Sequence, residues 1–202
     1  VVLENFLPGT MARLGLDYQN IKQRNPRMIY AAISGFGQDG PYTNKAALDV
    51  VVQGMGGILS ITGEPDGPPI RPGVSQGDIT AGLFAVIGIL SALQERHRSG
   101  LGQMVDIGML DCQVAILENA FARYFATGDV PQPLGTRHPV TAPFQVFPTR
   151  DSYITIALIE GRRERWPLLC SAIDRIDLID DPRFDTGWVR SQNHQLLEPI
   201  LS

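Results

Sequence analysis

The segment Met28-Ile-Tyr-Ala-Ala-Ile-Ser34, together with the Gly35-Phe-Gly37 that follows it, decides the fold class. Its apolar residues run without alternation, a pattern typical of a strand buried on both faces, as in a parallel sheet covered by helices. Sheets of this kind bind ligands beyond the carboxyl ends of their strands. The residues after this strand that are candidate ligand contacts are therefore Gly35, Phe36 and Gly37.

Further strands and helices are predicted on both sides of this segment. Val1–Leu3 and Gln103–Ile107 have the composition of strands, and a long apolar helix is predicted from Asp78 to Arg98, where Ser99-Gly100 stops it. The other predicted helices are Thr10–Leu14, capped by Thr10, then Tyr18–Arg24, Leu48–Ile61 and Met109–Thr127. The alternation of strands and helices indicates an α/β fold, with a parallel sheet and flanking helices.

The composition changes after Gly128. Residues 129–143 are rich in proline and lack periodicity, which predicts a linker or an active-site loop. Beyond it we expect the beginning of a smaller α+β domain, with strands at Phe144–Phe147 and Tyr153–Leu158 and helices at Arg163–Ile173 and Val189–Ser202. The predicted division is therefore 1–128, 129–143 and 144–202. Because the chain starts in a strand and ends in a helical pattern, we expect it to be a fragment.

Composition and charge exclude several classes of partner. The 202 residues carry a formal charge of −4, so no basic field favours nucleic acid or an anionic membrane. The apolar run Ile79–Leu93 is shorter than a membrane span. Cys112 and Cys170 lack the spacing of metal ligands and are expected to pack in the core of a reduced, cytoplasmic protein. We expect no nucleic acid, membrane or metal partner.

Asp78 is the carboxylate that opens the long apolar helix, directly after Gly77. An aspartate in this position is most often a helix N-cap. The positive end of a helix also favours an ionised carboxylate, and its free N–H groups can stabilise an oxyanion that develops nearby. From the residue alone, a capping role and a catalytic role both remain open.

Seven segments together resemble the family III CoA-transferases, a family that also includes the 2-methylacyl-CoA racemases. These segments are Val2-Leu-Glu-Asn-Phe-Leu-Pro-Gly9, Asn25-Pro-Arg27, Ser34-Gly-Phe-Gly-Gln38 with Gly40-Pro41, Thr62-Gly-Glu-Pro-Asp-Gly-Pro-Pro69, Gly77-Asp78, Arg98-Ser-Gly-Leu-Gly-Gln103 with Val105-Asp106, and Asp181-Pro-Arg-Phe184. They occur in the family's order from residue 1 to about residue 184, so the resemblance covers nearly the whole chain.

The resemblance implies a Rossmann-like large domain, a smaller α+β domain and interlocked homodimers. It also implies that Asp78 is a nucleophile, through which CoA passes from an acyl-CoA donor to a carboxylic acid acceptor by an aspartyl mixed anhydride and an aspartyl-CoA thioester. CoA is then a substrate, and no permanently bound cofactor is expected. The residues matched to CoA-binding positions are Asn5, Phe6, Pro8, Gly9, Met11, Arg13, Gly35, Phe36, Gly37 and Asp49.

Other basic residues are weaker candidates for this site. Arg71 could contact a phosphate, whereas the cluster Arg96-His97-Arg98 is better explained as the basic end of a helix, complementing its dipole. His138 lies in the proline-rich segment, at the place of a mobile loop in the family.

Two alternatives to a CoA-transferase remain. A racemase needs a base, and the racemase branch has a histidine where this chain has Leu48, and a glutamate that is absent from residues 144–149. Transferases more often carry an aromatic residue at the Leu48 position, so this chain departs from that pattern too. The second alternative is a non-catalytic CoA-binding remnant.

Overall fold

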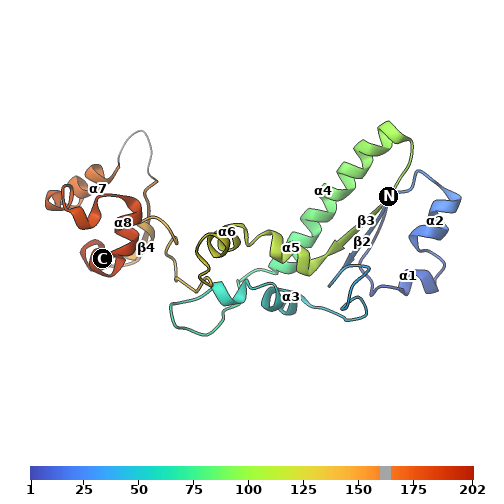
Figure 1. Cartoon of the computed structure of the whole chain (residues 1–202), viewed down its shortest axis with the longest axis horizontal. Helices are drawn as coiled ribbons and strands as arrows, with labels where there is room; N and C mark the ends of the chain where they lie inside the picture. Colours follow the sequence, from blue (N-terminus) through green and yellow to red (C-terminus); the bar gives the residue numbers. More distant parts are fainter. Residues whose placement is uncertain (160–164) are drawn as a thin grey trace. The chain divides into compact units, whose positions relative to one another are not determined.

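The computed structural model describes residues 1–159 and 165–202 (Figure 1). The chain forms two compact units. The first consists of residues 1–63 and 67–133, and the second of residues 64–66 and 134–202.

The first unit is built on a three-stranded parallel sheet in the order β1-β2-β3. The strands are β1 (Val2–Glu4), β2 (Tyr30–Ser34) and β3 (Met104–Gly108). Val2 pairs with Tyr30, which pairs in turn with Met104, so the three strands finish along one edge of the sheet. The predicted α/β class with a parallel sheet is confirmed.

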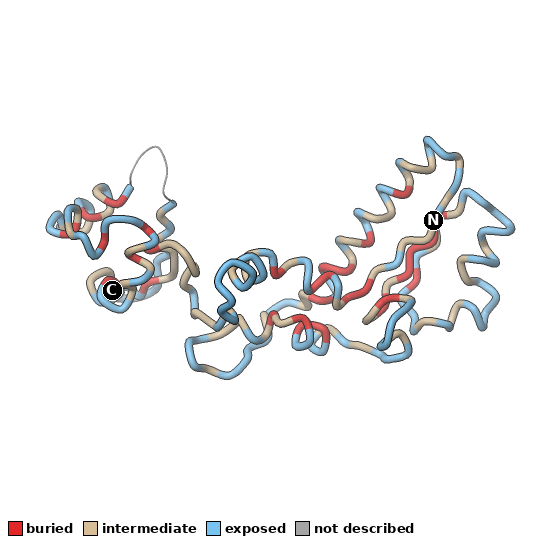
Figure 2. The backbone as a smooth tube through the Cα atoms, in the orientation of Figure 1, coloured by how far each residue is buried: buried red, intermediate tan, exposed pale blue. Residues whose placement is uncertain are grey.

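The first unit also contains several helices, and the longest of them packs directly on the sheet. In chain order they are α1 (Thr10–Arg13), α2 (Tyr18–Arg24), α3 (Asp49–Met55), the 3-10 helix η1 (Leu59–Ile61), α4 (Gln76–Ser99), α5 (Met109–Ala115) and α6 (Glu118–Thr127). Helix α4 contacts β2, β3, α3 and α5, and it runs beside the strands in Figure 1. The central strand β2 is the most buried of the three (Figure 2).

Three predictions about these helices were wrong in detail. The predicted helix Leu48–Ile61 is interrupted because Gly57 adopts φ +91°, a left-handed conformation that ends a helix. The predicted helix Met109–Thr127 breaks into α5 and α6 at Leu117, whose buried side chain packs against the backbone at Gly57. Thr10 is not the cap of α1, because Gly9 with φ +84° occupies the N-cap position.

Helix α4 is also the one described helix that is long and apolar enough to cross a membrane by length and composition. The predicted apolar run therefore belongs to a longer helix than expected. Core helices pass the same test, and α4 buries Ala81, Ala85 and Ala92 within the unit. These contacts place one face of α4 in the protein core.

The second unit combines a hairpin with short helices. Its elements are β4 (Phe144–Pro148) and β5 (Tyr153–Ala157), which pair antiparallel, then α7 (Trp166–Ala172), η2 (Ile176–Leu178), η3 (Pro182–Phe184), α8 (Gly187–Gln192) and α9 (His194–Leu201). The helix predicted over Val189–Ser202 is two helices, because Asn193 donates its side-chain amide to the Val189 and Arg183 carbonyls at their junction. Arg163, where another helix was predicted to begin, lies outside the described residues.

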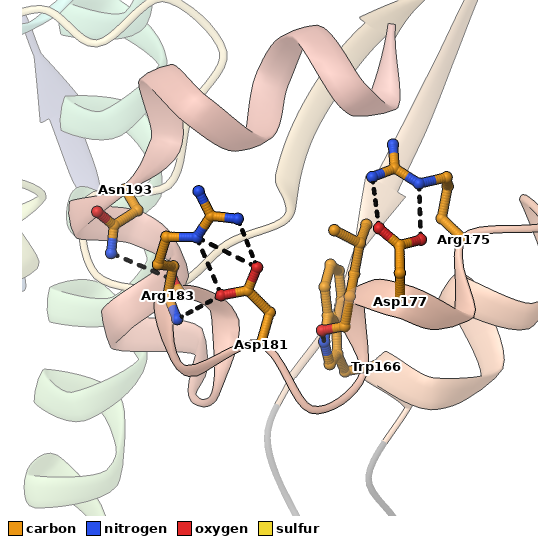
Figure 3. Close-up of polar contacts among 7 residues, drawn as sticks. Trp166, Arg175, Asp177, Asp181, Arg183 and Asn193 are labelled. Atoms are coloured by element: carbon orange, nitrogen blue, oxygen red, sulfur yellow. Dashed lines mark hydrogen bonds and ion pairs between the residues drawn. The ribbon is translucent and has the colours of Figure 1, made fainter.

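Local ion pairs lie on the surface of this unit (Figure 3). Arg183 pairs with Asp181 at 2.6 Å, and Arg175 pairs with Asp177 at 2.7 Å. Beneath them the Trp166 indole donates to the Leu178 carbonyl at 3.1 Å. The two arginine–aspartate pairs each join residues two positions apart. They therefore fix local turns and do not hold distant segments together.

Arg190 is the charged residue at the centre of the second unit, with 2 % of its surface exposed. Its guanidinium donates to the Ala142 carbonyl at 2.8 Å and to the Phe184 carbonyl at 2.7 Å. It also lies over the Trp166 ring, 4.7 Å from the ring centre. One side chain therefore connects α8, η3, α7 and the segment before β4.

Replacing Arg190 with methionine is expected to destabilise the second unit by about 3 kcal/mol or more, because buried carbonyls lose their donor. Urea unfolding, monitored by tryptophan fluorescence, measures this change in the free energy of unfolding, since Trp166 and Trp188 both lie in this unit. The matched control is Arg183→Met, whose side chain is 59 % exposed and whose loss should leave the midpoint unchanged. Equal midpoints for the two variants would contradict the prediction.

Candidate active site

The carboxyl edge of the parallel sheet is where two loop segments and the starts of two helices meet. Strand β1 leads into residues 5–8, strand β2 into Gly35 and strand β3 into Met109. Because α4 is the crossover between β2 and β3 and runs back along the sheet, its first turn returns to this edge. The topology therefore brings Asp78, in the first turn of α4, to the ends of the strands.

These segments enclose a cavity of about 470 Å³. That volume lies within the range of small-molecule sites. The lining residues, all in the first unit, are Asn5, Phe6, Leu7, Pro8, Ile33, Ser34, Gly35, Lys45, Ala46, Ala47, Asp78, Ala81, Gly82 and Met109. The cavity thus has one carboxylate, from Asp78, and one cationic side chain, from Lys45.

Asp78 is not the N-cap of α4, which is Ser75. In the described part of the chain no hydrogen bond or ion pair engages the Asp78 carboxylate, and the residue is exposed. The capping interpretation of this residue therefore has no support in the observed geometry. A carboxylate with no protein partner, facing a cavity, is available to an incoming molecule.

The turn at residues 5–8 is fixed by a buried carboxylate from the end of β1. Glu4 accepts the Phe6 N–H at 2.7 Å and lies 3.3 Å from the Tyr30 hydroxyl, which donates to it. Burial, with the Glu4 charge second, raises the pKa of Tyr30 to about 12, so the hydroxyl keeps its proton at neutral pH. Asn5, Phe6 and Pro8 are thereby presented at the cavity wall.

The loop after β2 lies close against the strand end. A Cβ added at Gly35 would come within 2.3 Å of the Ala47 Cβ, so only glycine permits this approach. Further along the loop, the Lys45 ammonium lies 4.1 Å from the centre of the Tyr42 ring, which packs edge-on against Phe36. Lys45 is also one of the residues that line the cavity of Asp78, so the loop contributes to its wall.

Asp49 lies at the start of α3 and contacts the first turn of α4. Its carboxylate accepts the Gly77 N–H at 2.8 Å and pairs with Arg71 at 2.9 Å. Burial alone would raise the pKa of Asp49, but hydrogen bonds from Gln53, Arg71 and Gly77 outweigh it, and the pKa falls below its ordinary value of 3.8. Asp49 is therefore charged at neutral and mildly acidic pH.

The predicted CoA-binding residues divide into two groups. Asn5, Phe6, Pro8 and Gly35 line the Asp78 cavity. The others do not line it: Gly9 is the N-cap of α1, Met11 and Arg13 lie on α1, Phe36 and Gly37 lie in the loop after β2, and Asp49 contacts α4. CoA binding stays a prediction for the residues of both groups.

The weaker candidates have other partners within the chain. Arg71 pairs with Asp49, and Arg96 donates to the Arg27 carbonyl at 3.0 Å. Arg98 pairs with Glu95 at 2.9 Å. In the second unit, the His138 ring accepts the Val140 N–H at 3.3 Å.

Several of the residues that line the cavity were not predicted from the sequence, although two patterns in the sequence point to some of them. Ala81 and Gly82 follow Asp78 by three and four positions, which places them on the same face of a helix. Met109 directly follows β3, and its neighbour Gly108 pairs with Ser34, so the rule that ligands bind at strand ends applies to it equally. Lys45 carried no such signal, because its position depends on the path of the loop.

Comparison with known proteins agrees with this architecture. Residues 1–202 match CoA-transferase family III, and the chain belongs to this family. It is 41% identical over 202 residues to a succinate–glutarate CoA-transferase from Agrobacterium fabrum. It is 43% identical over 202 residues to an acetyl-CoA:oxalate CoA-transferase from Acetobacter aceti. It covers 50% and 51% of those proteins, so the chain spans about half the length of the curated relatives it matches.

Solved structures give the same result for the fold. A CAIB/BAIF family protein from Brucella suis superposes with a TM-score of 0.82 at 41% identity, covering 99% of this chain and 52% of that one. A protein of Mycobacterium tuberculosis superposes with a TM-score of 0.85 at 32% identity, covering 99% of this chain and 53% of that one. The predicted family membership is confirmed over the whole chain.

The two cysteines are expected to be unreactive in the folded chain. Burial, with the charge of Asp111 second, raises the pKa of Cys112 to about 11, so only about one thiol in a thousand is ionised at pH 8. Cys170 is fully buried, and burial raises its pKa as well. Incubation with iodoacetamide at pH 8, read by mass spectrometry, should label both residues only after urea is added. Rapid labelling of Cys112 in the native chain would contradict this prediction and would make Cys112 a candidate nucleophile.

Proposed function

We propose that this chain carries the CoA-transfer site of its family and that Asp78 is the nucleophile. The observation that carries the proposal is the Asp78 carboxylate, which lacks a partner among the described residues and lines a cavity at the carboxyl edge of the sheet. The fold, the family and the cavity size all support a site for an acyl-CoA and a carboxylic acid. CoA acts here as a substrate.

The proposed reaction is covalent catalysis in balanced steps. The Asp78 carboxylate attacks the thioester carbonyl of the donor, the C–S bond breaks, and CoA leaves as the thiolate. The thiolate then attacks the Asp78 carbonyl of the resulting mixed anhydride, which releases the donor acid as a carboxylate and leaves an aspartyl-CoA thioester. The acceptor carboxylate repeats these steps in reverse, so Asp78 is regenerated and the acceptor departs as its CoA thioester.

Backbone groups around Asp78 can assist these steps. Each attack produces a negatively charged oxygen, which N–H groups of a helix first turn can stabilise. Asp78 lies in that turn of α4. Each step exchanges one activated acyl group for another, so the chemistry proceeds without an external energy source.

We also propose that the full protein is a homodimer with a Rossmann-like large domain, of which the first unit is part. The support is the family membership and the coverage of about half of each relative. Relatives whose names specify succinate, glutarate or oxalate as substrates make dicarboxylic acids the first acceptors to test.

The Asp78 proposal is tested by trapping. The chain is incubated with succinyl-CoA and hydroxylamine, and peptides are analysed by mass spectrometry. Hydroxylamine attacks the aspartyl carbonyl of the mixed anhydride or of the CoA thioester and leaves a hydroxamate, which we expect at Asp78 alone. Asp78→Asn should abolish this product, whereas the control Asp129→Asn, at an exposed loop residue, should not change its yield.

Other outcomes distinguish the alternatives. Exchange of the α-proton of a 2-methylacyl-CoA without any adduct would overturn the proposal in favour of a racemase. Binding of CoA without adduct or exchange would indicate a CoA-binding remnant.

Lys45 is expected to contribute to binding of the anionic substrate, because it is the cationic residue among those that line the cavity. Lys45→Met should weaken CoA binding by roughly twofold to fivefold, as expected of an exposed charge, and the difference should shrink as salt is added. Isothermal titration calorimetry at two salt concentrations measures both effects. The matched control is Lys22→Met on α2, where a lysine also lies over a tyrosine ring, 5.5 Å from its centre. Equal losses in both variants would contradict a specific role for Lys45.

A further inference from the structure

We infer that Asp49 is a positioning residue for Asp78, acting through the backbone of the α4 first turn. This inference rests on the proposed function of Asp78. The resemblance assigned Asp49 to CoA binding, but the residue does not line the cavity. Its carboxylate is directed to groups of the protein, and those groups determine where α4 begins.

The central contact joins Asp49 to the amide directly before Asp78. Asp49 Oδ1 accepts the Gly77 N–H at 2.8 Å. The N–H groups of a helix first turn have no acceptor within the helix, and the N-cap Ser75 makes no side-chain capping bond. Asp49 therefore supplies from α3 the cap that the N-terminus of α4 does not supply for itself.

The Asp49 carboxylate is held in turn by two other side chains. The Gln53 side-chain amide lies 2.8 Å from each carboxylate oxygen, and Arg71 donates to Oδ2 from Nε at 3.2 Å and from Nη2 at 2.9 Å. The same Arg71 Nη2 lies 3.2 Å from the Ser75 hydroxyl. With all these donors in place, the carboxylate has one orientation, and the loop before α4 is connected to it.

The close approach depends on glycine at position 77. A Cβ there would lie 2.8 Å from Val52 Cγ2 and 3.0 Å from Asp49 Oδ1, distances that real side chains do not tolerate without a shift. A second contact fixes the same turn from the other side, because the buried Gln113 amide donates to the Thr80 hydroxyl at 2.9 Å. The backbone on both sides of Asp78 is thus fixed, while its side chain faces the cavity.

Charge, and not only shape, is expected to matter at position 49. Asparagine has one acceptor oxygen, and its amide would face the donors of Gln53 or Arg71. Glutamate keeps both oxygens and the charge but adds a methylene group. We therefore expect Asp49→Asn to release the first turn of α4 and Asp49→Glu to retain part of its order.

The first measurement does not depend on catalysis. Hydrogen–deuterium exchange, read by mass spectrometry over the whole chain, should show exchange at residues 76–80 about tenfold faster or more in Asp49→Asn, the effect of losing a charge-assisted hydrogen bond. The exchange rate in Asp49→Glu should lie between the rates in Asp49→Asn and in the wild-type chain. The matched control is Glu95→Gln, which makes the same chemical change in an arginine pair at the other end of α4 and should not affect residues 76–80.

Unchanged exchange at residues 76–80 in Asp49→Asn would overturn the inference. Loss of protection throughout β2 in the same variant would also overturn it, since Asp49 would then be needed for the fold as a whole.

The second measurement separates positioning from substrate contact. At saturating succinyl-CoA, the rate of hydroxamate formation at Asp78 should fall in Asp49→Asn by up to about a hundredfold, the cost of a small misplacement of a reacting group. The half-saturating concentration should change little, and Asp49→Glu should restore part of the rate. An unchanged rate with a raised half-saturating concentration would show instead that Asp49 contacts CoA, and would overturn the inference.

The two proposals fail in different ways. If the unchanged chain forms no adduct at Asp78 while residues 76–80 respond to Asp49→Asn as expected, the proposed nucleophile is wrong and the contact between Asp49 and the α4 first turn is supported.

Discussion

The parallel register of the three strands is the constraint on which the site depends. Because β1, β2 and β3 run in one direction, their carboxyl ends lie on one side of the sheet: β2 and β3 end opposite each other at Ser34 and Gly108, and β1 ends at Glu4, opposite Ala32. Each strand must then continue into a turn, loop or helix at that same edge. The crossover between β2 and β3 returns the start of α4 there as well. Four segments far apart in sequence therefore border one cavity, and three of them directly continue the paired strands.

Within that frame, close backbone contacts determine the fine geometry. The absence of a Cβ at Gly35 lets the loop that carries Lys45 lie against the strand end, and the absence of one at Gly77 lets a carboxylate reach the α4 backbone. Carboxylates serve the same purpose at two places, since the buried Glu4 accepts from the turn after β1 and the partly buried Asp49 accepts from the first turn of α4. The cavity wall is thus fixed largely through backbone amides, which leaves the Asp78 side chain without a structural task.

The sequence predicted the strands and the longest helix well, because continuous apolar runs bounded by turn formers determine these elements locally. It did not predict the breaks at Gly57 and Leu117, since these two residues pack against each other across 60 positions of the chain. At the site, family resemblance pointed to Asp78, and helical periodicity could have added Ala81. The partners of Asp49 could not be predicted, because Arg71 reaches it from a loop 22 residues away.

The side of the cavity formed by α4 and the loop after β2 is made of very small residues, namely Ala46, Ala47, Ala81 and Gly82. Two of these positions have room for a larger side chain, because Ala46 is exposed and a Cβ at Gly82 would meet no atom within 4 Å. Ala81 is buried in the core, and Ala47 packs against Gly35. If Asp78 is the nucleophile, as proposed, single substitutions at Ala46 or Gly82 would narrow the space beside it and leave its carboxylate unchanged. These two positions are therefore the natural ones at which to alter the size of acid that the site would accept.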